Sequence, residues 1–345
     1  MFTLKQLTKP IIQAPMAGGP CTPELVAAVS NAGGLGSFGF AYSTPEKIDQ
    51  DLQAARAKTT GPINTNFFVF KAVSPPDQST EIKALSALQS LAVASKAFTT
   101  SLTIPRAPFY PDLNEQLAPI WEHRPAVLTF HFGIPDSSII DQAHTLDIAV
   151  GMTATCVAEA LAIESAGADF IVAQGIEAGG HRGIFDVQAN DEQLTTLALT
   201  MQLCQHCAIP IVSAGGIMDG TDIRAALDAG ASAAQLGTAF LCCDESGASP
   251  AHKHFLLTEH IRGSKMTQAF SGRPARGIDN AFIQQMKDKT CLPFPLQNTL
   301  TGSLRQWAAR TNDGEYQSLW AGTQYHRSRA LPAAKLMQTL ATEMK

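Results

Sequence analysis

The sequence lacks the segments that direct a chain out of the cell or into a membrane. Its first residues, MFTLKQLTKPIIQAPM, contain no basic segment followed by a long apolar run and a cleavage site, so we expect no secretory signal. No stretch reaches the roughly 18 uninterrupted apolar residues that a membrane-spanning helix needs. The 7 cysteines are odd in number and widely scattered, a usage typical of reduced thiols. These absences predict a cytoplasmic protein that does not enter a membrane.

The sequence also lacks an excess of basic residues, and it contains too few paired cysteines for a zinc site. The formal net charge is −5 and the pI is about 6.0, which gives no reason to expect binding to nucleic acid or to an anionic membrane surface. Cys204 and Cys207 form a C-x-x-C, but they lie in the apolar helical run LALTMQLCQHCAIP, and no second pair completes a zinc site. We therefore interpret both thiols as structural and expect no metal.

Short apolar runs rich in β-branched residues recur along the first two thirds of the chain, each followed by a helical segment. The 8 clearest strand candidates are Ile11–Ala14, Gly34–Phe38, Ile63–Phe68, Ala126–His131, Ile148–Ala154, Phe170–Gln174, Ile211–Ala214 and Ala233–Leu236. They do not alternate strictly, which fits strands of a parallel sheet buried on both faces. This order predicts an α/β fold, a closed (β/α)8 TIM barrel. An open doubly wound sheet is the alternative, but its usual G-x-G-x-x-G is missing after the first strand, where Met16–Pro20 stands.

The alternation of strands and helices is interrupted twice. Between about Lys71 and Pro125 the spacing predicts an added helix over 80–95, a short strand over 98–104 and a surface excursion over 105–111. After about residue 248 the alternation is lost, and helix-rich sequence with proline and glycine breaks follows. We predict a barrel over residues 1–248 and a smaller, mainly helical region over 249–345 that closes over one end of the barrel. The boundary is approximate, and a return of the chain to the barrel stays open.

Two glycine-rich turns follow the last two predicted strands. They contain Gly215 and Gly216 in the first turn, and Gln235, Leu236, Gly237 and Thr238 in the second. Without a side chain, glycine lets backbone N–H groups approach and donate to phosphate oxygens. Barrels often bind phosphate at this pair of loops. Either cluster alone is typical of a tight turn, but their joint position favours a phosphorylated cofactor.

The segment after the sixth strand, AQGIEAGGHRG, offers polar groups at the same end of the barrel. Gln174 can present its amide to the polar edge of a flavin ring, while Gly179 and Gly180 let the loop lie against a flat ligand. His181 is a candidate base near neutral pH. A lone loop histidine is usually only solvated, but one set among glycines directly after a buried strand favours a catalytic role.

The third predicted strand carries two amide side chains, and the fourth ends in a histidine. Alternation places Asn64 and Asn66 on one face of the third strand, and inward amides are costly unless they have hydrogen-bond partners. A cofactor or a water network would supply those partners. His131 stands at the mouth of the fourth strand, where lining a pocket and serving as a satisfied structural histidine are about equally expected.

Taken in order, these segments resemble the nitronate monooxygenases, formerly called 2-nitropropane dioxygenases, and among them the class I, bacterial-type members. The resemblance rests on PIIQAPMAGG, SNAGGLGS, NTNFF, TFHFG, AQGIEAGGHRG, SAGGIMDG and QLGTAF. It covers residues 10 to about 245, and SGRPARG at Ser271–Gly277 extends it. Any one motif is weak, whereas 7 in register are highly specific.

The resemblance implies a barrel with a smaller second domain that binds FMN without a covalent link. The residues implied to bind the cofactor, the last two beside its ring, are Gln174, Gly179, Gly180, Gly215, Gly216, Gln235, Leu236, Gly237, Thr238, Asn66 and Met16. His181 would abstract the α-proton of a neutral nitroalkane, whereas a preformed nitronate needs no base. The implied reaction passes through an anionic flavin semiquinone and uses O2 to convert alkyl nitronates, such as propionate 3-nitronate, and also nitroalkanes, to a carbonyl compound and nitrite.

Several expectations stay open beside this resemblance. His131 and Tyr110 are candidates for the substrate pocket, and Lys265, Arg273 and Arg276 are further candidates for substrate contact. The expected partners are a small-molecule substrate and O2, with a monomer or homodimer as the assembly. The alternative activity is that of an NAD(P)H-dependent flavin reductase of quinones or enoyl thioesters on the same fold. A barrel that binds phosphorylated sugars or purine nucleotides without flavin, and a non-catalytic flavin-binding regulator, are weaker alternatives.

Overall fold

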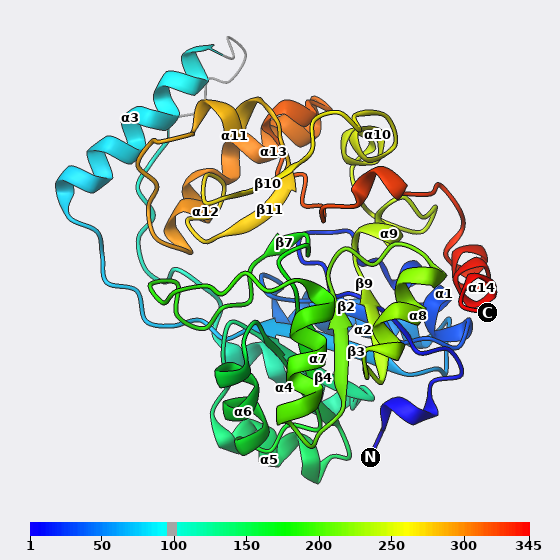
Figure 1. The fold of residues 1–345 in the computed structure, drawn as a ribbon. Helices are drawn as coiled ribbons and strands as arrows, with labels where there is room; N and C mark the ends of the chain where they lie inside the picture. Colours follow the sequence, from blue (N-terminus) through cyan, green and yellow to red (C-terminus); the bar gives the residue numbers. More distant parts are fainter. Residues whose placement is uncertain (95–101) are drawn as a thin grey trace.

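A barrel of eight parallel strands forms the body of the protein (Figure 1). The computed structural model describes residues 1–94 and 102–345. The barrel strands are β1 (Ile11–Gln13), β2 (Gly36–Gly39), β3 (Ile63–Phe68), β4 (Val127–His131), β5 (Ala149–Ala154), β6 (Phe170–Gln174), β8 (Ile211–Ala214) and β9 (Ala233–Leu236). All eight coincide with the strands predicted from the apolar runs, with ends that differ by at most two residues.

The barrel closes between its first two strands. The paired order runs from β1 through β9, β8, β6, β5, β4 and β3 to β2. Leu35 N–H donates to Ile11 O over 3.0 Å, and Gln13 N–H donates to Leu35 O over 3.0 Å, which joins the two ends of this order. The predicted closed α/β barrel is therefore confirmed, and the doubly wound alternative is wrong.

Helices surround the barrel and cover its outer face (Figure 1). They are α1 (Pro23–Asn31), α2 (Pro45–Arg56), α4 (Leu113–His123), α5 (Ser137–Thr145), α6 (Val157–Ser165), α7 (Thr196–His206), α8 (Gly220–Asp228) and α14 (Ala333–Glu343), with the short α9 (Thr238–Leu241) after β9. Capping residues explain where two of them begin. The side chains of Thr22 and Thr44 accept hydrogen bonds from backbone N–H groups in the first turns of α1 and α2, and a proline follows each.

One end of the barrel is filled with apolar side chains, which leaves the other end for the site. Leu4, in the short helix η1 (Leu4–Gln6), packs there against inward residues such as Ile12, Val127 and Phe170. At the opposite end, where the parallel strands terminate, the inward residues become polar. Function is therefore expected at the carboxyl end, as in other barrels.

A smaller region lies over that carboxyl end, in the upper part of Figure 1. Its elements are α3 (Gln78–Ala94), α10 (Pro250–Thr258), β10 (Ser264–Thr267), β11 (Ala275–Ile278), α11 (Ala281–Gln285), α12 (Leu296–Leu300), α13 (Gly302–Arg310), η2 (Gly314–Tyr316) and η3 (Tyr325–Arg327). A shared apolar cluster joins α3 to the segment from Ala269 to Leu304. The region is mainly helical and caps one end of the barrel, as predicted.

Two details of this region differ from the sequence-based expectation. The strands β10 and β11 were not predicted; they form an antiparallel sheet with β7 (Gly180–His181). The strand predicted over 98–104 falls partly outside the described residues, and residues 102–104 belong to no strand. The helix predicted over 80–95 corresponds to α3, although Ser95 lies outside the described residues.

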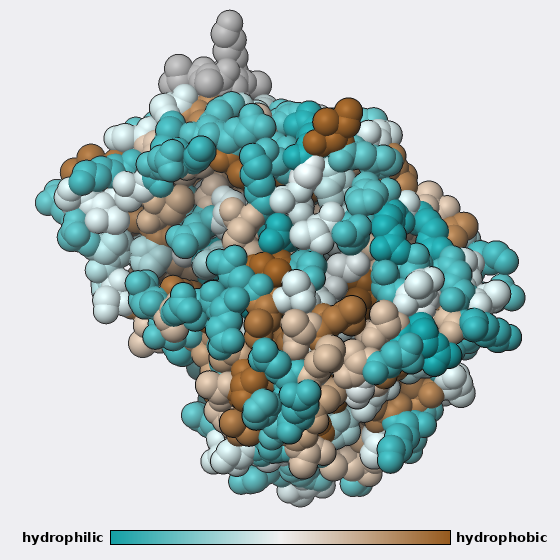
Figure 2. All heavy atoms as spheres, viewed as in Figure 1, coloured by the Kyte–Doolittle hydropathy of each residue, from teal (hydrophilic) through white to brown (hydrophobic). Residues whose placement is uncertain are grey.

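The end of the chain packs on the barrel rather than on the smaller region. Leu336, Met337 and Leu340 of α14 share an apolar cluster with Leu25 of α1 and Ile223 of α8. The division at residue 248 stays a prediction. No helix in the described parts of the chain has both the length and the apolar character for a membrane crossing. On the face shown in Figure 2 most residues are hydrophilic, with hydrophobic residues scattered among them.

Candidate active site

A cavity of about 590 Å³ lies between the carboxyl end of the barrel and the smaller region. Most of the residues selected from the sequence line it: Met16, Asn66, His131, Gln174, Gly179, Gly180, His181, Gly215, Gly216, Gln235, Gly237 and Thr238. The structure therefore brings together side chains and turns from the carboxyl ends of six barrel strands.

Leu236 and Tyr110 do not line this cavity. The side chain of Leu236 is buried on the outer side of the barrel, in an apolar cluster with Ile11 and Phe240. The Tyr110 ring stacks on Phe70 at 4.7 Å between centroids, which places it in an aromatic group beside the cavity.

His181 is held in place through its backbone. Its carbonyl oxygen accepts hydrogen bonds from Gln174 Nε2 over 3.0 Å and from His131 Nε2 over 3.2 Å. Gln174 Oε1 also accepts from Gly183 N–H over 2.7 Å, so a single amide fixes the loop on both sides of Arg182. On the other edge, His181 pairs with Ala275 of β11. His131 thus both lines the cavity and is satisfied by a structural hydrogen bond.

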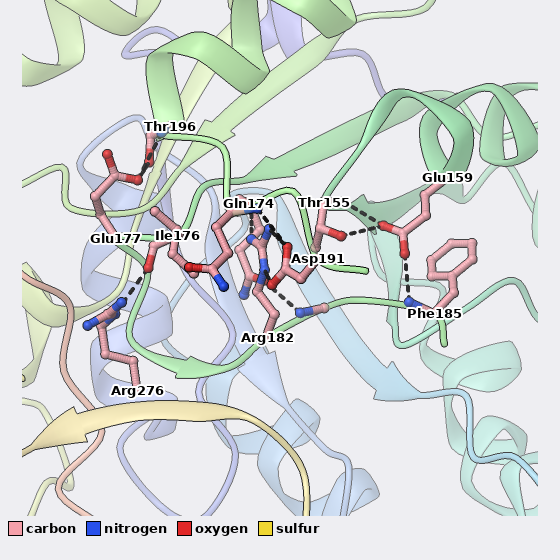
Figure 3. A network of polar contacts seen from close by, with 12 residues as sticks. Thr155, Glu159, Gln174, Ile176, Glu177, Arg182, Phe185, Asp191, Thr196 and Arg276 are labelled. Atoms are coloured by element: carbon pink, nitrogen blue, oxygen red, sulfur yellow. Dashed lines mark hydrogen bonds and ion pairs between the residues drawn. The ribbon is translucent and has the colours of Figure 1, made fainter. Parts of the chain in front are cut away.

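Ion pairs and carboxylate contacts anchor the same loop to the barrel (Figure 3). Arg182 pairs with Asp191 over 2.8 Å and donates to Gln174 O. Glu159 accepts hydrogen bonds from Thr155 N–H over 2.7 Å and from Phe185 N–H over 2.6 Å. These contacts tie the loop after β6 to its neighbours, and a loop fixed at many points holds a catalytic side chain in one geometry.

The His181 ring lies among four aromatic rings. The centroids of Phe68, Phe132, Phe294 and Trp320 lie 5.9, 5.7, 5.5 and 5.6 Å from that of His181. Burial, helped by positive charge nearby, lowers the pKa of His181 to about 3. The imidazole is therefore neutral throughout the physiological pH range.

A buried serine defines which ring nitrogen of His181 carries the proton. Ser271 Oγ lies 2.9 Å from His181 Nε2 and donates its own proton to the Arg273 carbonyl oxygen over 3.1 Å. A hydroxyl has one proton to give, so Ser271 accepts from His181 Nε2–H. The lone pair then lies on Nδ1, and this assignment follows from the hydrogen bonds around the ring.

The two glycine turns form a cradle that suits a phosphate. Gly216 has a φ of 68°, and a Cβ there would lie 3.0 Å from Glu177 Cβ and 3.7 Å from Thr323 Oγ1. Within the described chain, the backbone N–H groups of Gly216 and Gly237 donate to no acceptor, and the buried Thr323 Oγ1 has no partner. Unsatisfied donors at a position closed to side chains fit an anionic group that approaches the backbone.

The inward amides of β3 are satisfied within the protein. Asn64 donates to Ser37 Oγ over 3.1 Å and accepts from Thr129 Oγ1 over 3.0 Å, while Asn66 Nδ2 donates to Thr129 Oγ1 over 3.0 Å. Only Asn66 of the two reaches the cavity. Met16 N–H donates to Cys21 Sγ over 3.1 Å.

The further candidates for substrate contact have structural partners and do not line the cavity. Lys265 pairs with Asp279 over 2.6 Å. Arg276 donates to Ile176 O over 3.0 Å, which also anchors the loop after β6 (Figure 3). The Arg273 guanidinium lies 3.9 Å from the centroid of the Phe132 ring.

Several lining residues escaped the sequence-based selection. They are Tyr42 and Phe68 from the barrel, and Ser249, His252, Asn298, Arg305 and Trp320 from the later part of the chain. His252 is buried, its Nε2 has no partner among the described residues, and burial lowers its pKa to about 4. Phe68 ends the NTNFF motif but was not selected, and no motif marked the other positions, because they reach the cavity from elements far apart in the sequence.

Comparisons with known proteins agree with this geometry. The sequence model of the family described as nitronate monooxygenase matches residues 2–343. A nitronate monooxygenase from Paraburkholderia phytofirmans is 39% identical, over 100% of this chain and 94% of that protein. The chain belongs to the nitronate monooxygenase family. It is accordingly an oxidoreductase, and the family predicted from the motifs is confirmed.

Two solved structures are similar to this chain over nearly its whole length. A nitroalkane oxidase from Streptomyces ansochromogenes superposes with a TM-score of 0.91 at 38% identity, over 99% of this chain and 97% of that one. FabK from Thermotoga maritima has a TM-score of 0.75 at 26% identity, over 99% and 94% of the two chains. This nitronate monooxygenase family member therefore shares its whole architecture, smaller region included, with both.

Proposed function

We propose that the protein is an FMN-dependent nitronate monooxygenase. It oxidises alkyl nitronates of the propionate 3-nitronate type with O2, giving a carbonyl compound and nitrite, and it acts more slowly on neutral nitroalkanes. The observation that carries the proposal is a neutral histidine, enclosed by aromatic rings, in the same cavity as two glycine turns with unpaired N–H groups. A cytoplasmic location and a monomeric or homodimeric state complete the proposal.

The residues present fit FMN. The phosphate would be held by the N–H groups of Gly216 and Gly237 and by the hydroxyl of Thr323, which otherwise lack partners in the described chain. Asn66 and Gln174 would lie beside the ring, since both reach the cavity from inside the barrel. When bound, FMN supplies the electron-transfer chemistry that links nitronate oxidation to O2.

His181 would take the α-proton from a neutral nitroalkane at its Nδ1 atom. Ser271 keeps the proton on Nε2, and the bonds to the His181 carbonyl keep the ring in position. An imidazole whose pKa is about 3 stays neutral but is a weak base. Abstraction from carbon is therefore slow, whereas a preformed nitronate, which has already lost this proton, avoids the step.

The test compares two substrates with two forms of the enzyme. Nitrite release and O2 consumption are measured for the purified protein with propionate 3-nitronate and with nitroethane. His181→Asn is expected to lose most turnover of nitroethane, by at least about 100-fold, while keeping most turnover of the nitronate. An equal loss on both substrates would remove the base assignment.

The alternative flavin reductase is tested with the same preparation. The protein is mixed anaerobically with NADH, with NADPH and with propionate 3-nitronate in turn, and its visible absorption is followed. We expect the visible absorption to change rapidly with the nitronate only. Rapid bleaching by a pyridine nucleotide alone would favour the reductase and contradict the proposal.

A further inference from the structure

Arg305 of α13 brings a positive charge into a cavity that otherwise holds neutral side chains. Among the described residues that line the cavity there is no Asp, Glu or Lys, and Arg305 is the one arginine. The three lining histidines are neutral, because burial lowers the pKa of His131 and His181 to about 3 and that of His252 to about 4. The side chains around the cavity therefore carry a single positive charge and no negative one.

The protein fixes this guanidinium without giving it a counter-ion. Arg305 Nε donates to Thr301 Oγ1 over 3.1 Å, and Nη2 donates to Asn298 O over 2.6 Å and to Asn298 Oδ1 over 2.9 Å. All three acceptors are neutral. Within residues 1–94 and 102–345, Arg305 forms no ion pair and its Nη1 has no acceptor. Burial lowers the pKa of Arg305, as expected for a cation removed from water without a carboxylate partner.

Arg305 lines the same cavity as His181 and Tyr42. Burial raises the pKa of Tyr42 and lowers that of His181, and the charge of Arg305 acts on both groups in the direction that lowers the pKa. Tyr42 lines the cavity from the loop after β2, and its hydroxyl has no partner in the described parts of the chain. The cofactor's phosphate has its own donors at Gly216 and Gly237. The anion that binds Arg305 is therefore expected to belong to the substrate rather than to the cofactor.

We propose that Arg305, with the Tyr42 hydroxyl, binds a carboxylate carried by the substrate at the end remote from the carbon that is oxidised. Arginine suits this role because its planar guanidinium presents several N–H donors to a carboxylate. The site then selects carboxylated nitronates over uncharged ones of the same length. This inference rests on the proposed function, to which it adds the residue that selects among nitronates.

The test measures a selectivity rather than a rate alone. Propionate 3-nitronate is compared with propyl 1-nitronate, in which a methyl group stands where the first has its carboxylate. The selectivity ratio is kcat/KM for propionate 3-nitronate divided by kcat/KM for propyl 1-nitronate. Arg305→Met is expected to lower this ratio by about 10- to 100-fold, because KM for the carboxylated substrate rises. Arg305→Lys, which keeps the charge, should recover part of the ratio. Arg310→Met, at the exposed end of the same helix, is the matched control and should leave the ratio unchanged.

A second readout does not depend on turnover. Propionate, which has the carboxylate but no nitro group, is titrated into the FMN-loaded enzyme by calorimetry. We expect binding that weakens at least about tenfold in Arg305→Met and not in Arg310→Met. FMN content and circular dichroism of each variant show whether the cavity is intact. This arm still reports on Arg305 if neither nitronate is oxidised, in which case the proposed function alone has failed.

Three results would overturn the inference. An unchanged selectivity ratio in Arg305→Met would show that no carboxylate is bound there. An equal loss on both nitronates would assign Arg305 to the nitronate group that they share. Loss of FMN from Arg305→Met but not from Arg310→Met would assign the guanidinium to the cofactor.

Discussion

The pH dependence of nitroalkane oxidation reports directly on the surroundings of His181. The perturbation is a change of pH from 7.5 to 5.0 with nitroethane, which stays protonated on carbon across this range. Only the neutral imidazole accepts the α-proton, so kcat/KM follows the neutral fraction of His181 in the free enzyme. A folded-state pKa below the ordinary value means that activity is retained on acidification and is lost only as the pH falls through the lower value.

The size of the effect follows from the lowered pKa. An imidazole with the ordinary pKa of 6.5 would be about 90% neutral at pH 7.5 and about 3% neutral at pH 5.0, a loss of about 30-fold. With a pKa of about 3, the same ring stays about 99% neutral at pH 5.0. We therefore expect kcat/KM to change by less than about 1.5-fold between these two pH values.

The assay is the initial rate of nitrite release, with nitroethane added from an acidic stock so that no nitronate is introduced. FMN content and circular dichroism at each pH control for loss of cofactor or fold. An apparent pKa between 6 and 7 in kcat/KM would refute the reasoning, because His181 would then titrate as a solvated histidine.

Three further predictions concern the cofactor, the proton and the fold. Gly216→Val should lower FMN content after purification, because the φ of 68° and the nearby Glu177 leave no room for a side chain; Gly167→Val, at a φ of 90° in open space, is the control for backbone strain and should retain FMN. Ser271→Ala should slow nitroethane turnover about 5- to 10-fold, measured by nitrite release, with little effect on the nitronate, because the His181 tautomer loses its partner; equal slowing of both would contradict this role. The three cavity histidines have folded-state pKa values below that of the unfolded chain, so their contribution to stability is complete above about pH 6.5 and is lost as the pH falls toward 3–4. The urea midpoint should therefore drop between pH 7 and pH 4.5, and less so in His252→Gln; identical slopes would count against a neutral buried His252.

The barrel could be predicted from the sequence because its signals are local. Each strand is a short apolar run, and several helices begin with a capping threonine followed by proline, as at Thr22 and Thr44. The residues that end these strands were found for the same reason, since parallel strands deliver their carboxyl ends to one edge of the barrel. His181 and Gly216 are examples.

The smaller region could not be predicted in the same way. Its core joins α3 to residues about 200 positions later, and no local pattern records such a pairing. The strand β7 has 2 residues and exists only because β11 lies beside it. Arg305 was missed because its helix shows an ordinary amphipathic pattern, and its importance comes from the absence of a nearby carboxylate, which only the three-dimensional structure reveals.

The role assigned to Leu236 shows how a motif can include a residue that supports the site only indirectly. Leu236 stands between Gln235 and Gly237, both of which line the cavity. Alternation along β9 turns its side chain outward, where it packs in the apolar cluster with α1 and α14. Its contribution to FMN binding stays a prediction that concerns its backbone.

The central claim is that the cavity at the carboxyl end of the barrel holds one FMN, with its phosphate at Gly216 and Gly237. The most direct measurement is the visible absorption spectrum of the purified protein, followed by release of the pigment on heating and its identification. The account predicts a yellow protein that releases about one FMN per chain. A folded protein that is colourless and does not take up added FMN would contradict it.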